Sequence, residues 1–253
     1  MMMFKNETVL YEVNDQVATI KLNRPKVKNA VNFQMHEELY DAFQTAQHDE
    51  NVRVIVLTGT EDSFSSGADI KSFPLNEMEN FDHGEALEKT YNKLILLMEE
   101  IDKPTVAYLN GTAVGAGLSL ALACDFRFAD RNAKMALSFI KIGLTPDAGA
   151  SYFLPRLVGL GKALELSLGE AINGEEALRI GLIHQLGDPA EFVAKLVHAP
   201  SPAYSSMKQN MKAGMHLSLR ETLDLEVEGQ RAAGKSPFHK QAIKNFIQGN
   251  RKK

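Results

Sequence analysis

Loops rich in glycine, alanine and serine carry the groups of this chain that could do chemistry. One of them, Gly111 to Gly117, runs directly into an apolar segment that is long enough for a buried helix. Because glycine allows close backbone approach and a helix start offers free N–H groups, an anion or an oxyanion would fit there. The segment lacks the third glycine of a dinucleotide fingerprint and the lysine of a phosphate loop. A close-packed turn without ligand is the alternative interpretation.

A second loop of small residues, Phe64 to Lys71, comes soon after the β-branched run Val52 to Thr58. In an open α/β sheet, ligands gather beyond the carboxyl ends of the strands. Two adjacent strands that end in such loops place two N–H donors on one oxygen, which is an oxyanion hole, and each donor supplies roughly 3 kcal/mol of transition-state stabilisation. Asp69, taken alone, is typical of a turn or a helix cap.

A third loop, Ile142 to Ser151, contains a single acid, Asp147. An isolated loop aspartate most often caps a helix, so the spacing alone does not make it a catalyst. The 7 histidines are scattered without the spacing of zinc ligands. Ser119 lies in a helical run rather than in the sharp turn of a hydrolase nucleophile. A metal centre and a serine hydrolase are therefore disfavoured.

Length, net charge and cysteine content limit the class of protein to which the chain can belong. Its 253 residues suit one large α/β unit with a small appendage, and a formal net charge of -4 gives no field that would gather nucleic acid. A single cysteine, Cys124, fits a reducing compartment and is expected to be buried. The N-terminus lacks the pattern of a signal peptide, and no run is apolar enough to span a membrane. We expect a cytoplasmic protein without nucleic-acid or membrane partners.

The elements that must position these loops follow from hydrophobic periodicity. Alternating strands and helices predict an α/β fold. The expected elements are a hairpin over residues 9–22 that turns at Asn14-Asp15, a helix after the N-cap Asn32 up to about His48, strands at Val52 to Thr58 and Thr105 to Leu109, and a helix over Leu87 to Ile101. Another helix opens at Asn173, where the spacing to Glu176 predicts a capping box.

The C-terminal part differs in pattern from the rest. Ala199 to Pro202 is rich in proline and predicts a hinge. Beyond it the sequence predicts amphipathic helices, including Leu217 to Ala232 and Phe238 to Gly249. We therefore expect a core with the active site over residues 1–198 and a helical module over residues 199–253.

Several motifs in the same order resemble the crotonase (enoyl-CoA hydratase/isomerase) superfamily over nearly the whole chain. They are Ser66 to Lys71, Asn110 to Gly117, Cys124-Asp125 and Gly181 to His184. The resemblance implies a spiral of ββα units with a helical C-terminal module that forms trimers, commonly paired into hexamers. It also implies an acyl-CoA thioester as substrate. Coenzyme A would be part of that substrate, and no separate cofactor or metal is implied.

The resemblance also implies which residues form the site. It maps the two N–H groups that polarise the thioester carbonyl onto Ala68 and Ala116. The CoA portion would lie along the Lys26 to Ala30 segment and along a loop formed by Gly67, Ala68, Asp69, Ile70 and Lys71. Lys26 and Lys71 would face the phosphates as point charges. Phe246 and Lys252 would contribute from a neighbouring subunit.

The catalytic acids depart from the hydratase pattern. Hydratases of the superfamily use two glutamates, because adding water requires a base and an acid. Those positions are Ser119 and Phe139 here. Asp147 stands where isomerases of the superfamily carry an aspartate, and residues 138–149 closely resemble the bacterial ring-epoxide phenylacetyl-CoA isomerases.

The resemblance therefore favours an isomerase that shifts a double bond or rearranges a ring epoxide through an enolate. A hydratase that uses Asp147 alone is one alternative. A non-catalytic homologue that binds acyl-CoA or RNA is another.

Overall fold

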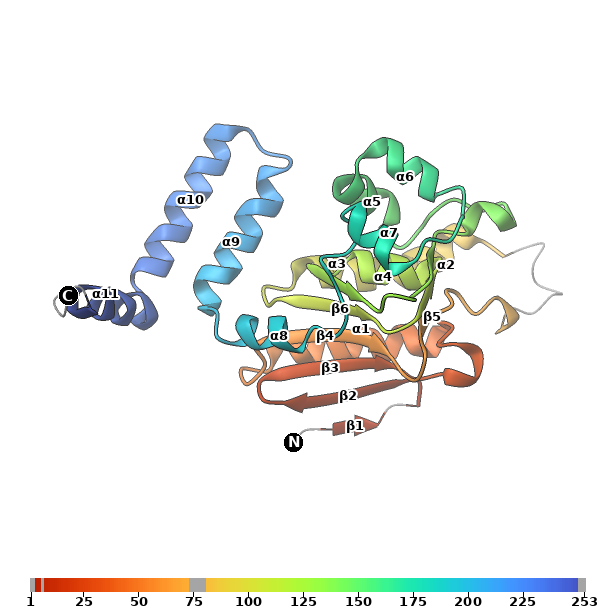
Figure 1. Cartoon of the computed structure of the whole chain (residues 1–253), viewed down its shortest axis with the longest axis horizontal. Helices are drawn as coiled ribbons and strands as arrows, with labels where there is room; N and C mark the ends of the chain where they lie inside the picture. Colours follow the sequence, from red (N-terminus) through yellow and green to blue (C-terminus); the bar gives the residue numbers. More distant parts are fainter. Residues whose placement is uncertain (1–2, 6, 73–80, 250–253) are drawn as a thin grey trace. The chain divides into compact units, whose positions relative to one another are not determined.

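The structure is a computed structural model that describes residues 3–5, 7–72 and 81–249 (Figure 1). The chain divides into two compact units, Met1–Val197 and His198–Lys253. Among the described residues, no helix combines the length and the apolar character that a membrane crossing requires.

The first unit contains a large sheet whose strands lie in the order β1-β2-β3-β4-β6-β8-β10. The first three strands pair antiparallel, and every later pair is parallel. Every residue of β4 is buried, as its near-continuous apolar sequence predicts. The strands are β1 (Met3–Lys5), β2 (Val9–Asn14), β3 (Val17–Leu22), β4 (Val54–Gly59), β6 (Thr105–Leu109), β8 (Phe126–Ala129) and β10 (Gln185–Leu186).

A second sheet of three short parallel strands has the order β5-β7-β9. Its strands are β5 (Ser63–Ser65), β7 (Thr112–Val114) and β9 (Met135–Ala136). Along the chain, β4, β6 and β8 of the large sheet are each followed by one strand of the small sheet and then by helix. The expected spiral of ββα units is thereby confirmed.

The helices of the first unit lie in the connections between the strands, except α8, which follows the last strand (Figure 1). The α-helices are α1 (Phe33–His48), α2 (His83–Lys89), α3 (Tyr91–Glu100), α4 (Ala116–Leu122), α5 (Ala150–Val158), α6 (Leu160–Leu166), α7 (Gly174–Arg179) and α8 (Ala190–Val197). Short 3-10 helices among the described residues are η1 (Pro25–Val27), η2 (Ile70–Ser72) and η4 (Phe139–Ile142).

The second unit is helical, with α9 (Ser201–Gly214), α10 (Leu219–Gly234) and α11 (Pro237–Gly249). Helix α9 packs against α10. A capping box opens α10, where the Ser218 side chain accepts from the Glu221 N–H and the Glu221 carboxylate accepts from the Ser218 N–H. That this unit drives assembly stays a prediction.

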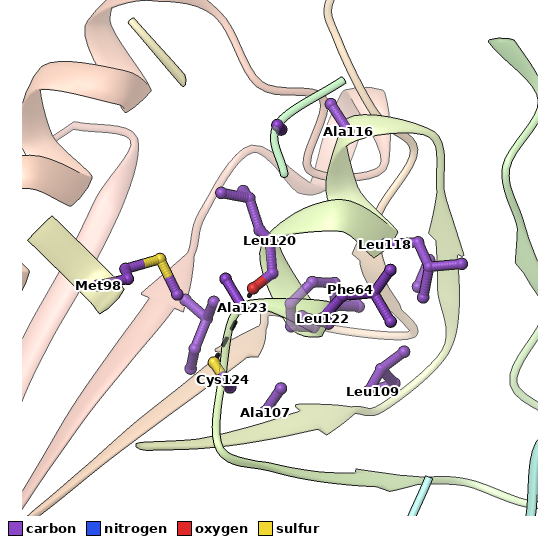
Figure 2. Close-up of a cluster of buried hydrophobic side chains, with 14 of the residues drawn as sticks. Phe64, Met98, Ala107, Leu109, Ala116, Leu118, Leu120, Leu122, Ala123 and Cys124 are labelled. Atoms are coloured by element: carbon purple, nitrogen blue, oxygen red, sulfur yellow. Dashed lines mark hydrogen bonds between the residues drawn. The ribbon is translucent and has the colours of Figure 1, made fainter. Parts of the chain in front are cut away.

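The core of the first unit is built around α4, whose residues are all buried. Figure 2 shows its leucines in one apolar cluster with Phe64, Leu109 and Met98. Cys124 follows the helix at 3% exposure, and its thiol lies 3.9 Å from the Leu120 carbonyl oxygen. The cysteine is a small buried residue, as expected. The buried helix fixes the Gly-rich turn that precedes it.

Two predicted details shift because of local backbone geometry. The hairpin turns at Asp15 and Gln16, which have φ values of 48° and 67°, rather than at Asn14-Asp15. Two consecutive left-handed residues match the twist of a two-residue hairpin. The expected helix over Leu87 to Ile101 is broken at Thr90, whose hydroxyl donates to the Ala86 carbonyl oxygen at 2.6 Å. A threonine that bonds the preceding turn competes with helix continuation.

The capping box predicted at Asn173 forms only in part. The Asn173 side chain accepts from the Glu176 N–H at 2.9 Å. The Glu176 carboxylate, however, binds the Arg179 guanidinium at 2.6 Å instead of reaching back to Asn173. An arginine one turn later offers two charge-assisted bonds where the backbone offers one neutral bond.

Candidate active site

The two candidate oxyanion loops leave the same edge of the small sheet. Strands β5 and β7 pair in parallel, so the residues after Ser65 and after Val114 emerge side by side. Gly67 has a φ of +94°, and a Cβ on it would lie 2.8 Å from the Val114 carbonyl oxygen and 3.6 Å from Ala116 N. The loops therefore touch at a point where only glycine fits.

The N–H groups of Ala68 and Ala116 are both free to bind a ligand oxygen. Ala68 forms an isolated bridge with Val31, in which the Val31 N–H donates to Gly67 and the Asp69 N–H donates to Val31. That pattern uses the backbone groups beside Ala68 and leaves its own N–H aimed the other way. Ala116 begins α4, so its N–H lacks an intrahelical acceptor. Neither N–H donates to another group within the described part of the chain.

Gly117 allows α4 to approach β5 closely. A Cβ on Gly117 would lie 2.6 Å from Ser65 Cβ and 2.9 Å from the Ser65 carbonyl oxygen. Real Cβ atoms do not approach other atoms so closely. Gly117 follows one candidate donor and Ser65 precedes the other, so this contact sets how far apart the two loops stand.

An ion pair joins the two segments that the resemblance assigns to CoA. Arg24 Nη1 lies 2.7 Å from Asp69 Oδ2 and also donates to the Ala30 carbonyl oxygen at 2.7 Å. Asp69 is 8% exposed. Its carboxylate therefore ties the loop after β5 to the segment before α1, and the turn or cap interpretation of Asp69 gives way to this role.

The other residues assigned to CoA divide into buried and exposed ones. Ala30 is buried. Lys26, Ile70 and Lys71 are exposed, and their contact with CoA stays a prediction. Phe246 lies on α11 in the second unit and is 69% exposed. Lys252 lies outside the described residues. The structure thus brings Ala30 and the Gly67 to Lys71 loop together within the first unit.

Asp147 lies in the loop between η4 and α5, and the helix-cap interpretation does not hold. Gly149 occupies the N-cap of α5, and no side chain makes the capping bond. Burial raises the pKa of Asp147 from 3.8 to about 6. Its Oδ1 atom is buried without a hydrogen-bond partner in the described residues. A carboxylate that burial makes more basic, and that no cation among the described residues pairs with, is suited to take a proton from a ligand.

The two positions that the resemblance assigns to the hydratase glutamates hold side chains that do not act as a general acid or base. Ser119 is fully buried, and its hydroxyl donates to the Gly115 carbonyl oxygen at 3.2 Å. Phe139 is buried, and its Cζ would lie 3.9 Å from a Cβ on Gly115. The phenyl ring therefore covers the turn that precedes Ala116.

Two polar groups near Asp147 are not singled out by sequence spacing. Tyr91 falls within the helix predicted over Leu87 to Ile101, and His36 is one of the 7 scattered histidines. The charge of Asp147 acts on the Tyr91 hydroxyl, and the His36 ring packs on the Tyr91 ring. A tyrosine within an otherwise aliphatic stripe was the available sign, since a buried hydroxyl requires a partner.

Comparison with known proteins identifies the family. The model of the enoyl-CoA hydratase/isomerase family matches residues 12–252, so the chain belongs to that family and is an enzyme of it. The 1,2-epoxyphenylacetyl-CoA isomerase of Escherichia coli is 33% identical, and the match covers 95% of each chain. The short-chain-enoyl-CoA hydratase of Clostridium acetobutylicum is 32% identical over 95% of this chain and 94% of the other.

Solved structures agree with this assignment. The enoyl-CoA hydratase of Thermoplasma volcanium superposes with a TM-score of 0.87 at 30% identity, covering 95% of this chain and 97% of the other. The resemblance drawn from the motifs is therefore confirmed, and so is the crotonase-like fold. Relatives of similar identity are named isomerase and hydratase, so similarity alone does not distinguish the two reactions.

Proposed function

We propose that the chain is an acyl-CoA isomerase that shifts a double bond, or rearranges a ring epoxide, through an enolate. The observation that carries the proposal is Asp147, a partly buried carboxylate with a pKa raised to about 6 and an unpartnered Oδ1 within the described residues. Asp147 takes a proton from one carbon of the acyl group, and the electrons of that C–H bond move onto the thioester carbonyl oxygen. The N–H groups of Ala68 and Ala116 bind this oxygen.

The second step returns the same proton to a different carbon, which restores the carboxylate and moves the double bond. One carboxylate suffices because every atom of the substrate is kept. Hydration also requires a group that positions and deprotonates water. The Ser119 hydroxyl donates its hydrogen bond to a backbone carbonyl oxygen, and the Phe139 ring has no proton to transfer. Both observations favour isomerisation.

Incubation with a panel of 2-enoyl- and 3-enoyl-CoA esters tests the reaction, with products resolved by retention and mass. Isomerisation changes the retention and leaves the mass unchanged. Asp147→Asn should lower the rate by at least about 100-fold, the lower bound for losing a general base, while CoA-ester binding stays within about three-fold. Asp15→Asn, in the exposed hairpin turn, is the matched control. Activity of Asp147→Asn within tenfold of the unmodified chain would refute the assignment.

A hydratase that uses Asp147 alone is the second candidate, and the naming of the Clostridium relative favours it. The same panel separates the two functions, because hydration adds the mass of water and removes the conjugated absorbance of a 2-enoyl thioester. Loss of that absorbance with a product heavier by one water would replace the isomerase proposal.

A further inference from the structure

Ser65 is a buried serine between the two candidate oxyanion loops, and the proposed mechanism does not yet use its hydroxyl. It is the last residue of β5 and is fully buried. The hydroxyl donates to the Asn29 carbonyl oxygen at 2.8 Å and accepts from the Gly67 N–H at 3.2 Å. One side chain therefore ties the loop that carries Ala68 to the segment before α1.

The peptide that carries the Ala116 N–H is held by its own helix. The carbonyl oxygen of this peptide belongs to Gly115, and it accepts from the Ser119 N–H at 3.0 Å and from the Ser119 hydroxyl at 3.2 Å. The C=O and N–H groups of a trans peptide point in opposite directions. The Ala116 N–H therefore points out of the start of α4, and no other segment is needed to aim it.

The peptide that carries the Ala68 N–H lies in a loop and depends on other segments. Its carbonyl oxygen, that of Gly67, accepts from the Val31 N–H at 2.8 Å, so the Ala68 N–H points away from Val31. The other backbone group of Gly67, its N–H, is the one that donates to Ser65. Glycine has the greatest backbone freedom, so these two bonds are what fixes the direction of the donor.

The residue to which the Ser65 hydroxyl donates is itself firmly held. Asn29 is fully buried. Its side chain accepts from the Arg24 N–H at 2.8 Å and donates to the carbonyl oxygens of Ser63 at 2.7 Å and Thr60 at 3.1 Å. Asn29 is therefore a fixed anchor, and the hydroxyl of Ser65 transmits its position to the loop.

We propose that Ser65 is a positioning residue, which acts through Gly67 to aim the Ala68 N–H at the thioester carbonyl oxygen. The proposal rests on the proposed function, because Ala68 is one of the two donors in that mechanism. Ser65 is fully buried, so it transfers no proton to the substrate. It acts on the rate through the direction of a hydrogen bond that strengthens as the enolate forms.

Three substitutions separate this role from packing. Ser65→Ala removes the hydroxyl and keeps the Cβ that lies against Gly117, so the spacing of the loops is preserved. Ser65→Cys keeps the size of the side chain with a weaker donor and acceptor. Ser63→Ala is the matched control. Ser63 lies on the same face of β5 and is 3% exposed, but its hydroxyl is 3.5 Å from each of its two acceptors.

The infrared carbonyl band of a bound thioester reports the donors directly. The probe is hexanoyl-CoA labelled with carbon-13 at the thioester carbon, which has no double bond to move. Hydrogen bonds from the two N–H groups should lower its stretching frequency on binding. Ser65→Ala should retain about half of this shift, because one donor of the two is misdirected. Ser65→Cys should be intermediate, and Ser63→Ala should retain the whole shift.

Kinetics of isomerisation provide the second measurement. Ser65→Ala should lower kcat by about ten-fold, less than the 100-fold or more for a donor removed outright, and leave KM within about three-fold. A general loss of folded protein would not change the band of the bound ligand. If Ser65→Ala does not fold, the comparison of Ser65→Cys with the unmodified chain decides in the same way.

The outcomes separate this proposal from the isomerase function. An equal shift in Ser65→Ala and the unmodified chain, or an equal loss in Ser63→Ala and Ser65→Ala, would overturn the role of Ser65. A normal shift without isomerisation by the unmodified chain would refute the isomerase alone. No shift with the unmodified chain would refute the oxyanion hole and the role of Ser65 with it.

Discussion

Arg24 and Asp69 form an ion pair that spans 45 residues of sequence, with Nη1 2.7 Å from Oδ2. The arginine also binds the Ala30 carbonyl oxygen, so one guanidinium fixes both segments assigned to CoA. The aspartate side chain is 9% exposed and the arginine 22%. An interaction that is shielded from water to this degree differs from the many surface pairs of the chain, which contribute little.

Arg24→Met should therefore lower the free energy of unfolding by about 1–3 kcal/mol, below the value for a fully buried pair because Arg24 is partly exposed. It should also raise KM for CoA esters several-fold with a smaller change in kcat. Urea denaturation and steady-state kinetics measure the two effects. Arg131→Met breaks the exposed pair with Glu175 and is the matched control. Equal behaviour of the two variants would contradict the role given to Arg24.

The raised pKa of Asp147 predicts the pH dependence of activity. Isomerisation requires the carboxylate, so kcat/KM should fall as the pH drops below about 6, the pKa that burial gives this group. Phosphate groups of the substrate also ionise near pH 6. A carbon-13 NMR titration of the carboxyl groups without substrate removes that ambiguity, and Asp147→Asn identifies the resonance. A titration midpoint near pH 4 would show that burial does not raise the pKa of Asp147 and would contradict the prediction.

The raised pKa of Asp147 also predicts that its ionised carboxylate lowers the free energy of unfolding at neutral pH. A carboxyl whose pKa is raised on folding stabilises the fold while protonated, below its unfolded pKa near 4, and this contribution is lost as the pH rises through about 6. Asp147→Asn should therefore match the unmodified chain at pH 4. At pH 7.5 it should be more stable by on the order of 1 kcal/mol, reduced for the partial exposure of Asp147. Urea denaturation at both pH values is the measurement, and a difference of the opposite sign would contradict the prediction.

Gly117→Ala should increase the distance between the N–H groups of Ala68 and Ala116, the two candidate oxyanion donors. The added Cβ would meet Ser65 at 2.6 Å, and the strain of about 1–3 kcal/mol exceeds the gain of up to about 1 kcal/mol in helix propensity. Because α4 must move away from β5, kcat/KM should drop by at least about ten-fold. Gly161→Ala is the control, since a Cβ there meets nothing within 4 Å. Activity and stability close to those of the unmodified chain would show that Ser65 yields without moving the loops.

The sequence by itself determined the family, the ββα order and the loops that carry the candidate donors. These features are local: small residues at fixed positions, apolar periodicity, and caps such as Asn32, which accepts from the Met35 N–H at 2.9 Å. Local patterns encode local backbone geometry, so they can be read from one chain. On spacing alone, Asp147 could be a helix cap or a catalytic carboxylate. The family resemblance favoured the catalytic carboxylate.

Only the tertiary structure decided the electrostatics of the site. Whether Asp147 is buried, which cation faces Asp69, and which hydroxyl lies near the catalytic candidate all depend on residues brought together from distant segments. Tyr91 illustrates the limit, because helical spacing places it on the buried face of α3 but does not show that its hydroxyl lies near Asp147. Burial and partner geometry set pKa values and unsatisfied hydrogen bonds, and neither is a property of sequence spacing.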